Sequence, residues 1–151
     1  MHSARIAAVS LLINFLIAGC AERSGTGKSV AIPIVSLSCG TAHCHQNIPA
    51  KAYIVYTTSS CSNASFGETV AGSTTLTCNG GGCSGTVTNF TDGSGSSANT
   101  MPDGFYSICV VLDFDSNYIG TAVTGDTTGA LNNTQITNGT TTRSVTSFAD
   151  L

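Results

Sequence analysis

The chain has 151 residues, which is enough for one domain with a modest core and too few for two. Only 9% of the residues are charged, and Thr (22), Ser (19), Gly (17) and Asn (10) make up 68 of them, a composition that favours strands and turns and excludes long helices. The formal net charge of −3, with five Lys and Arg, excludes the basic face of a nucleic-acid-binding protein.

The N-terminus has the organisation of an export signal, predicted to span residues 1–19. Arg5 precedes the apolar run IAAVSLLINFLI, which is too short to cross a bilayer as a helix, since crossing takes about 20 residues. The run leads into LIAGC, ending at Cys20, which resembles the lipobox of bacterial lipoproteins. The resemblance implies cleavage before Cys20 and attachment of lipid to its sulfur. The alternative is an ordinary secretory signal peptide.

Residues 20–29 contain the cysteine and a small, polar stretch, which predicts a flexible tether. Ala21, in place of Asp, resembles the residue after the cysteine in lipoproteins sent to the outer membrane of two-membraned bacteria. The resemblance implies a protein anchored in that membrane by its lipids, facing the periplasm or the cell surface. Residues 30–151 are then the folded domain.

The folded part contains short segments rich in Val, Ile, Thr, Tyr and Phe, bounded by Gly, Asn, Asp and Ser. This pattern predicts an all-β fold, a mostly antiparallel β-sandwich. In residues 105–113, the alternate residues from Tyr106 to Leu112 form the better core face. The polar segment 91–101 predicts a mobile linker. The expected strands are 30–38, 52–58, 73–78, 84–91, 105–113, 118–123, 134–138 and 141–148.

Six cysteines remain besides Cys20, and an even number in an exported protein predicts three disulfides among fifteen connectivities. Two of them flank the turn NGGG between Thr-rich runs, so we pair them across the neck of a hairpin. Cys39 and Cys44 have the same spacing as this pair, so we pair them as well. The expected disulfides are therefore Cys78–Cys83, Cys39–Cys44 and, by elimination, Cys61–Cys109.

The sequence CGTAHCH at residues 39–45 resembles a rare variant of the c-type haem attachment motif. The resemblance implies thioethers at Cys39 and Cys44 and His45 as an iron ligand, so the alternative function is a c-type cytochrome. The same residues with His43 could ligate zinc, but consecutive ligands converge poorly on a tetrahedron and a disulfide removes both thiolates. The simpler interpretation is a short disulfide loop with exposed histidines.

Residues 101–113, MPDGFYSICVVLD, resemble the proline-glycine-x-tyrosine turn and following strand of transthyretin-like and carboxypeptidase-regulatory-like β-sandwiches. The terminal segment from Asn138 is similar as well. The resemblance implies a non-catalytic structural or binding module of unknown ligand. Immunoglobulin domains are related in pattern but place a tyrosine two residues before a core cysteine, whereas Tyr106 precedes Cys109 by three.

The sequence DFDSN at residues 113–117 places oxygen-bearing side chains at alternate positions, which resembles the opening of a calcium loop. Asp113, Asp115 and Asn117 are the candidate calcium ligands, with Asp126 downstream. The glycine and glutamate of an EF-hand are missing from their usual positions. The alternative is that Asp113 ends a strand while Asp115 and Asn117 form side-chain turn bonds.

Residues suited to catalysis are few. The three histidines are His2, His43 and His45, and Glu68 is the single glutamate between residues 30 and 151. Neither G-x-S-x-G nor S-x-x-K occurs, so no nucleophile with an orienting base can be assembled. We therefore predict no catalytic residue, with an unrecognised hydrolase as the third alternative.

Overall fold

The computed structural model describes residues 27–44, 48–63, 70–116, 120 and 122–151. Its regular structure is all strand apart from one 3-10 turn, η1 (Cys61–Asn63), which confirms the all-β class. The strands are β1 (Ser29–Ala31), β2 (Ile34–Cys39), β3 (Ala50–Thr57), β4 (Val70–Asn79), β5 (Gly82–Val87), β6 (Phe90–Asp92), β7 (Ser97–Ala98), β8 (Thr100–Pro102), β9 (Gly104–Asp113), β10 (Thr127–Ile136), β11 (Thr142–Val145) and β12 (Phe148–Asp150).

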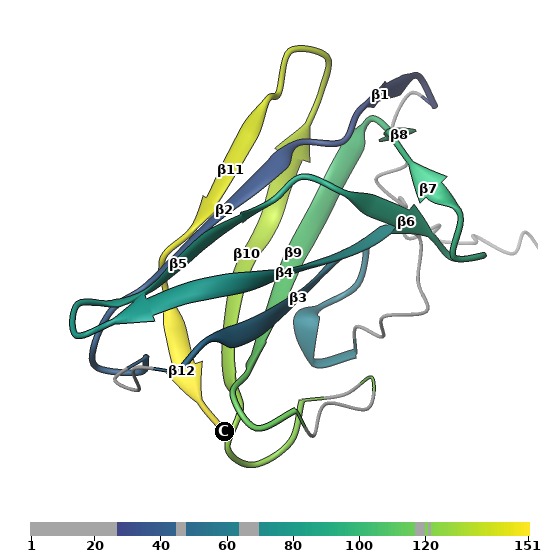
Figure 1. The fold of residues 1–151 in the computed structure, drawn as a ribbon. Coiled ribbons are helices and arrows are strands. Elements are labelled where there is room, and N and C mark those ends of the chain that lie inside the picture. The colour runs from purple at the N-terminus through teal and green to yellow at the C-terminus, as the bar shows by residue number, and fades with distance from the viewer. Residues whose placement is uncertain (1–26, 45–47, 64–69, 117–119, 121) are drawn as a thin grey trace, which may run out of the picture.

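The main sheet follows the order β11-β2-β5-β4-β3-β9-β10-β12 (Figure 1). Its neighbours are antiparallel except for β11 and β2, which run parallel. β6 pairs with the first residues of β4, and β7 pairs with β6. β1 and β8 form a separate two-stranded sheet.

The main sheet curls into a nearly closed barrel, which differs from the two separate sheets of the expected transthyretin-like or immunoglobulin-like sandwich (Figure 1). The cause lies in β4. Its residues 70–76 pair with β3, and its residues 77–79 pair with β5, so one long strand joins both halves of the sheet. Arg143 of β11, at one end of the strand path, donates through Nη2 to the main-chain oxygen of Gln135 in β10, the strand before the other end, at 2.6 Å.

β9 is buried on both faces. The predicted core face, from Tyr106 to Leu112, joins the hydrophobic core with the inward residues of β3 and β4, and each fully buried aliphatic side chain stabilises the fold by about 1.5–3 kcal/mol. On the outer face, Cys109 and Val111 are only 6% and 8% exposed. The Cys61–Cys109 disulfide brings η1 onto this outer face, which sequence alternation does not reveal.

Two buried tyrosines bind main-chain oxygens of prolines. The Tyr56 hydroxyl donates to the oxygen of Pro33 at 2.8 Å, and the Tyr106 hydroxyl donates to the oxygen of Pro102 at 2.9 Å. The two rings meet edge to face, with their centroids 6.4 Å apart. Burial raises the pKa of Tyr56 well above its ordinary value, so its hydroxyl remains a neutral donor. These bonds fix the chain before β2 and before β9.

The three disulfides join the pairs that spacing and elimination predict, Cys39–Cys44, Cys61–Cys109 and Cys78–Cys83. Cys83 lies opposite Cys78 in the β4–β5 hairpin and opposite Cys39 in β2, so two disulfides occupy neighbouring strands. Beside them, Gly82 has a φ of 112° and approaches the main-chain oxygen of Cys39. A Cβ at Gly82 would overlap that oxygen, so only glycine fits.

Three of the sequence predictions before residue 105 are wrong in detail, and one of them is the single strand expected at 84–91, which is divided into β5 and β6 at residues 88–89. The segment 30–38 is divided into β1 and β2 at Pro33, which has no N–H for a sheet. The segment 91–101, predicted as a mobile linker, forms the β6–β7 hairpin and part of β8. Asp92 turns the chain there, because its Oδ1 accepts hydrogen bonds from the main-chain N–H groups of Ser94 and Ser96 at 2.9 and 3.0 Å.

β10 begins at Thr127, seven residues before the predicted start at residue 134. Its pairing with β9 shifts between Leu131 and Thr134, and Asn133 has a positive φ of 51°. This irregularity interrupts the alternation of inward and outward side chains, and for this reason the sequence pattern did not predict the first half of the strand. The predicted strand 118–123 falls partly outside the described residues, and its described residues, at 120, 122 and 123, are not in a strand.

Candidate metal centre

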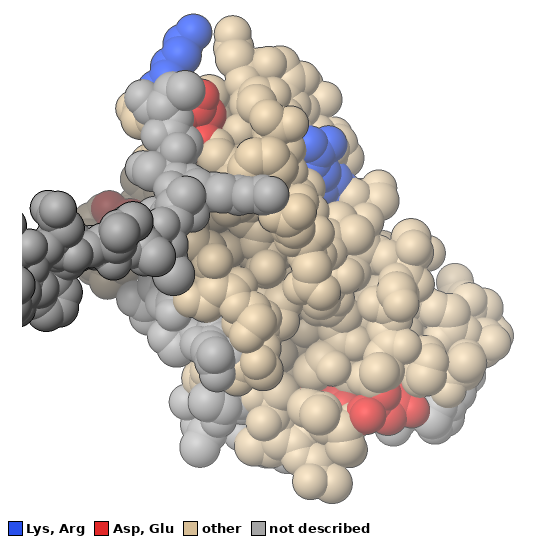
Figure 2. Space-filling model, turned by 180° about the vertical axis from the view of Figure 1, so that it is seen from behind, with Lys and Arg blue, Asp and Glu red and all other residues tan. Residues whose placement is uncertain are grey.

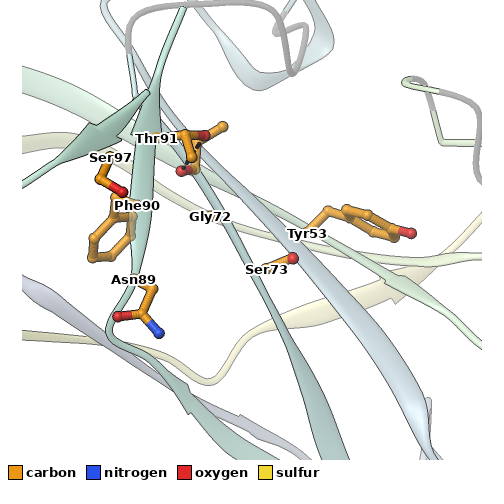
Figure 3. A pocket seen from close by; sticks show the side chains of 8 residues that line it. Tyr53, Gly72, Ser73, Asn89, Phe90, Thr91 and Ser97 are labelled. Carbon is orange, nitrogen blue, oxygen red and sulfur yellow. Dashed lines mark hydrogen bonds between the residues drawn. The ribbon is translucent and has the colours of Figure 1, made fainter. Parts of the chain in front are cut away.

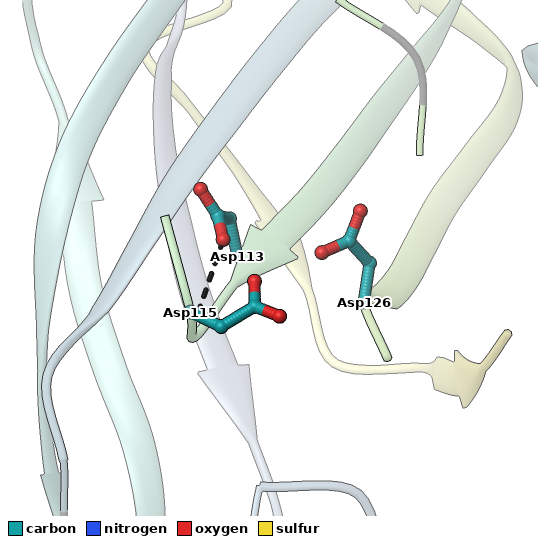
Figure 4. A group of neighbouring side chains, drawn as sticks. All are labelled: Asp113, Asp115 and Asp126. Carbon is teal, nitrogen blue, oxygen red and sulfur yellow. Dashed lines mark hydrogen bonds between the residues drawn. The ribbon is translucent and has the colours of Figure 1, made fainter. Parts of the chain in front are cut away.

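Three aspartates converge where β9 ends and β10 begins (Figure 4). Asp113 is the last residue of β9 and Asp126 directly precedes β10. Leu112 and Thr127 are register partners in this antiparallel pair. Asp113, which follows Leu112, and Asp126, which precedes Thr127, therefore also lie near each other. Asp115 approaches from the connecting loop. One carboxylate oxygen from each residue lies within 4.8 Å of the others.

Asp113 is held by the turn that follows it. Its Oδ1 accepts hydrogen bonds from the main-chain N–H of Asp115 at 3.2 Å and of Ser116 at 2.7 Å. Ser116 has a positive φ of 65°, which reverses the chain. Asp113 therefore ends β9, as the alternative interpretation expected, but its own carboxylate accepts the turn bonds that this interpretation gave to the side chains of Asp115 and Asn117. These bonds also orient the carboxylate of Asp113 beside the other two.

Asp126 is the most deeply placed member, with 1% of its surface exposed. Its Oδ2 accepts a hydrogen bond from the main-chain N–H of Val123 at 2.8 Å, while its Oδ1 is buried without a hydrogen-bond partner among the described residues. Burial, and then the negative charges of Asp113 and Asp115, raise the pKa of Asp126, although the Val123 N–H opposes them. A buried carboxylate oxygen that lacks a partner destabilises the fold unless a positive group binds it.

The main chain around Asp126 is firmly held. Its N–H donates to the oxygen of Val123 at 3.0 Å, and its oxygen accepts from the N–H of Leu151 at 3.0 Å. The terminal strand β12 pairs with the first residues of β10 immediately afterwards. The carboxylate of Asp126 is thus presented by an ordered backbone.

The donor set suits a hard cation. Three carboxylates offer only oxygen ligands, which Ca²⁺ binds in sets of about 6–8 at about 2.3–2.6 Å. Two ligands of one such ion lie no more than about 5.2 Å apart, and the three oxygens here meet that limit. Soft metals prefer sulfur or imidazole ligands, which this cluster does not offer.

The structure brings together only part of the predicted ligand set. Asp113 and Asp115 lie side by side as expected, whereas Asn117 lies outside the described residues. Asp126 joins them although the alternation D-x-D-x-N does not include it. The sequence analysis named Asp126 only as an acid downstream of the ligand set. Placing the start of β10 at residue 127 would have put it in the set, because the pairing of neighbouring strands brings together the residue that ends one strand and the residue that precedes the next.

The cysteine–histidine segment forms a different arrangement from a haem or zinc site. Cys39 and Cys44 are bonded to each other and buried, so neither sulfur is available for a thioether or a metal in this structure. His43 is exposed, and its Nδ1 lies 3.2 Å from Oδ2 of Asp150 in β12. His45 lies outside the described residues.

The anchor and signal predictions also fall outside the described residues, since the description begins at residue 27 and Cys20 precedes it. Within the described ranges, no helix is long and apolar enough to cross a membrane. Among the described residues, the face shown in Figure 2 carries few acidic or basic side chains and no broad patch of either sign.

Comparison of the sequence with protein-family models finds no match, and comparisons with curated proteins and with solved structures find none either.

Proposed function

We propose that this chain is an exported, lipid-anchored, non-catalytic module that binds a calcium ion between β9 and β10. The observation that carries the calcium site is the buried Oδ1 of Asp126, which has no hydrogen-bond partner among the described residues and lies beside two further carboxylates. A divalent cation would neutralise the mutual repulsion of the three groups and supply the missing partner. The ion would thereby stabilise the connection between the two strands.

Calcium added to the EDTA-treated protein should raise its melting temperature. A ligand at about 100 times its dissociation constant stabilises a fold by about 2.7 kcal/mol, which corresponds to about 5–10 °C for a chain of this size. Magnesium should have a smaller effect, because it demands a stricter octahedral geometry and dehydrates reluctantly. Differential scanning calorimetry measures both, and an unchanged melting temperature up to millimolar calcium would contradict the site.

The proposal of export rests on the cysteines and the N-terminal motif. The six cysteines other than Cys20 all form disulfides, which persist in oxidising compartments and are rare in the cytosol. The lipobox-like LIAGC at the end of the apolar run explains the seventh, Cys20. A periplasmic or cell-surface location on the bacterial outer membrane is consistent with both.

The intact mass of membrane-extracted protein tests the anchor. We expect a chain that begins at Cys20, carries diacylglycerol on its sulfur, and lacks the six thiol hydrogens that three disulfides remove. Treatment with a reductant should restore those hydrogens and leave the lipid in place. Detection of an unprocessed N-terminus with free thiols would refute both export and anchoring.

The absence of catalysis remains a prediction. The exposed pair of His43 and Asp150 is the arrangement closest to a catalytic one in the described part of the chain. The hydroxyl beside it, Oγ1 of Thr127, donates to Oδ1 of Asp150 at 3.0 Å, so it is bonded to the acid of the pair. This pairing supports a structural role, namely attachment of β12 to the end of the barrel.

A further inference from the structure

A hollow of about 340 Å³ opens on the outside of the barrel where β4 changes partners (Figure 3). β4 pairs with β6 up to Gly72 and with β5 from Thr77 onwards, so its middle residues lie between the two partners. Gly72 permits the close approach of β6, because a Cβ there would lie 2.8 Å from the Phe90 ring and from the main-chain oxygen of Asn89. The hollow therefore forms because β4 pairs first with β6 and then with β5, which leaves its middle residues without a partner strand on that side in the described part of the chain.

The described residues that line the hollow are mostly neutral and polar, and the ring of Phe90 among them packs edge to face against Tyr56 in the core. The volume of the hollow lies at the small end of the range of about 300–1,000 Å³ for small-molecule sites. Phe90 is buried and Tyr53 is half-buried, with Nζ of Lys51 lying 5.1 Å from the centroid of the Tyr53 ring. No charged side chain is among the described residues that line the hollow. Thr91 donates to the main-chain oxygen of Ala71 at 3.4 Å, which leaves its oxygen able to accept. The exposed polar side chains are Ser73, Asn89, Thr91 and Ser97.

Further uncharged hydroxyls continue from the hollow across the outer face of the sheet. Ser73 is followed on the same face of β4 by Thr75 and Thr77, which are exposed. Register then places Ser84 of β5 opposite Thr77, and Ser38 of β2 opposite Ser84. These side chains all donate and accept hydrogen bonds without carrying charge.

We propose that this hollow and the adjoining hydroxyl surface bind an uncharged saccharide. Hydroxyl and amide side chains match a ligand that presents many hydroxyl groups, each both donor and acceptor. The described residues of the lining carry no charged side chain, so these residues offer no charge that would attract nucleic acids or acidic glycans. The exposed polar lining disfavours a lipid chain, which needs an apolar pocket. The hollow takes one sugar ring, and the hydroxyls of β4 and β5 contact the rings that follow.

Soluble cello-, malto- and chito-oligosaccharides are suitable neutral probes, with an oligogalacturonate as the anionic comparison. We expect at least one neutral probe to produce saturable amide shifts in NMR spectra of the full chain, centred on Ser73, Asn89 and Thr91. If the chain is acylated, the detergent must lack a sugar headgroup. Spectra recorded with calcium and with EDTA keep the outcome independent of the calcium site.

Two asparagine variants provide the matched comparison. Asn89→Ala should weaken binding of the neutral probe by roughly fivefold, the loss expected for one or two hydrogen bonds. Asn99→Ala, at an exposed asparagine that is not among the lining residues, should leave binding unchanged. The proposal is overturned if no neutral probe binds at millimolar concentration, if the shifts centre elsewhere, if the two variants behave alike, or if oligogalacturonate binds as tightly.

Discussion

Replacing Cys61 and Cys109 together by alanine should lower the melting temperature by about 8–16 °C, the largest loss of the three disulfides. The two residues are 48 positions apart, and closing a loop of that length stabilises the fold by about 4 kcal/mol in the chain-entropy model. The disulfide also holds η1 against the outer face of β9, where Cys109 is 6% exposed. Calorimetry of the oxidised variant measures the loss.

The short disulfides serve as controls for this comparison. Cys39–Cys44 and Cys78–Cys83 each span five positions, so removing either should cost about 2 kcal/mol, or about 4–8 °C. A loss at either short disulfide that equals the loss at Cys61–Cys109 would mean that local strain or packing, and not loop closure, determines their contribution.

The disulfide pairs were predictable because their causes are local. A Gly-rich turn between two Thr-rich runs predicts a hairpin, and a hairpin neck brings Cys78 and Cys83 together. The same spacing predicts Cys39–Cys44, and elimination then leaves the long pair. The core face of β9 was predictable for the same reason, since alternation along one strand depends only on neighbouring residues.

The closure of the sheet was not predictable, because it depends on pairings between distant segments. β4 pairs with β3 and β5 through different parts of its length, and nothing in the sequence at Leu76 and Thr77 marks the change of partner. β11 pairs parallel with β2 from the other end of the chain, whereas the spacing of short strands indicated antiparallel neighbours. In a two-sheet sandwich and in a curled single sheet, inward and outward side chains alternate along each strand in the same way, so this pattern does not distinguish the two folds.

The cation site was half predictable. Asp113 and Asp115 belong to one local alternation that the sequence displays, but Asp126 is brought in by the pairing of β9 with β10. The bulge between Leu131 and Thr134 concealed the beginning of β10, and with it the position of Asp126. Asp126 supplies the strongest argument for the site, and it is the residue that the local sequence pattern could not assign to the set of ligands.

Asp126→Asn should have opposite effects on stability with and without calcium. In EDTA at neutral pH the variant should melt at a higher temperature than the wild type, because the substitution removes a buried negative charge that Asp113 and Asp115 repel. In calcium the wild type should gain about 5–10 °C and the variant little, since the ion loses its most deeply buried ligand. Calorimetry in both buffers measures the reversal.

The pH dependence in EDTA gives an independent check on the same carboxylate. The pKa of Asp126 in the folded protein is above its ordinary value of 3.8, so between these two values the folded state binds more protons than the unfolded state, and stability falls as pH rises. The melting temperatures of the wild type and Asp126→Asn should therefore be equal below pH 3.8, and their difference should grow with pH until the pH exceeds the raised pKa.

Asp92→Asn is the matched control, because hydrogen bonds from Ser94 and Ser96 lower the pKa of that exposed carboxyl. It should be slightly less stable than the wild type at neutral pH and keep the full calcium response, and an Asp126→Asn protein that still responds to calcium would exclude this carboxylate as a ligand.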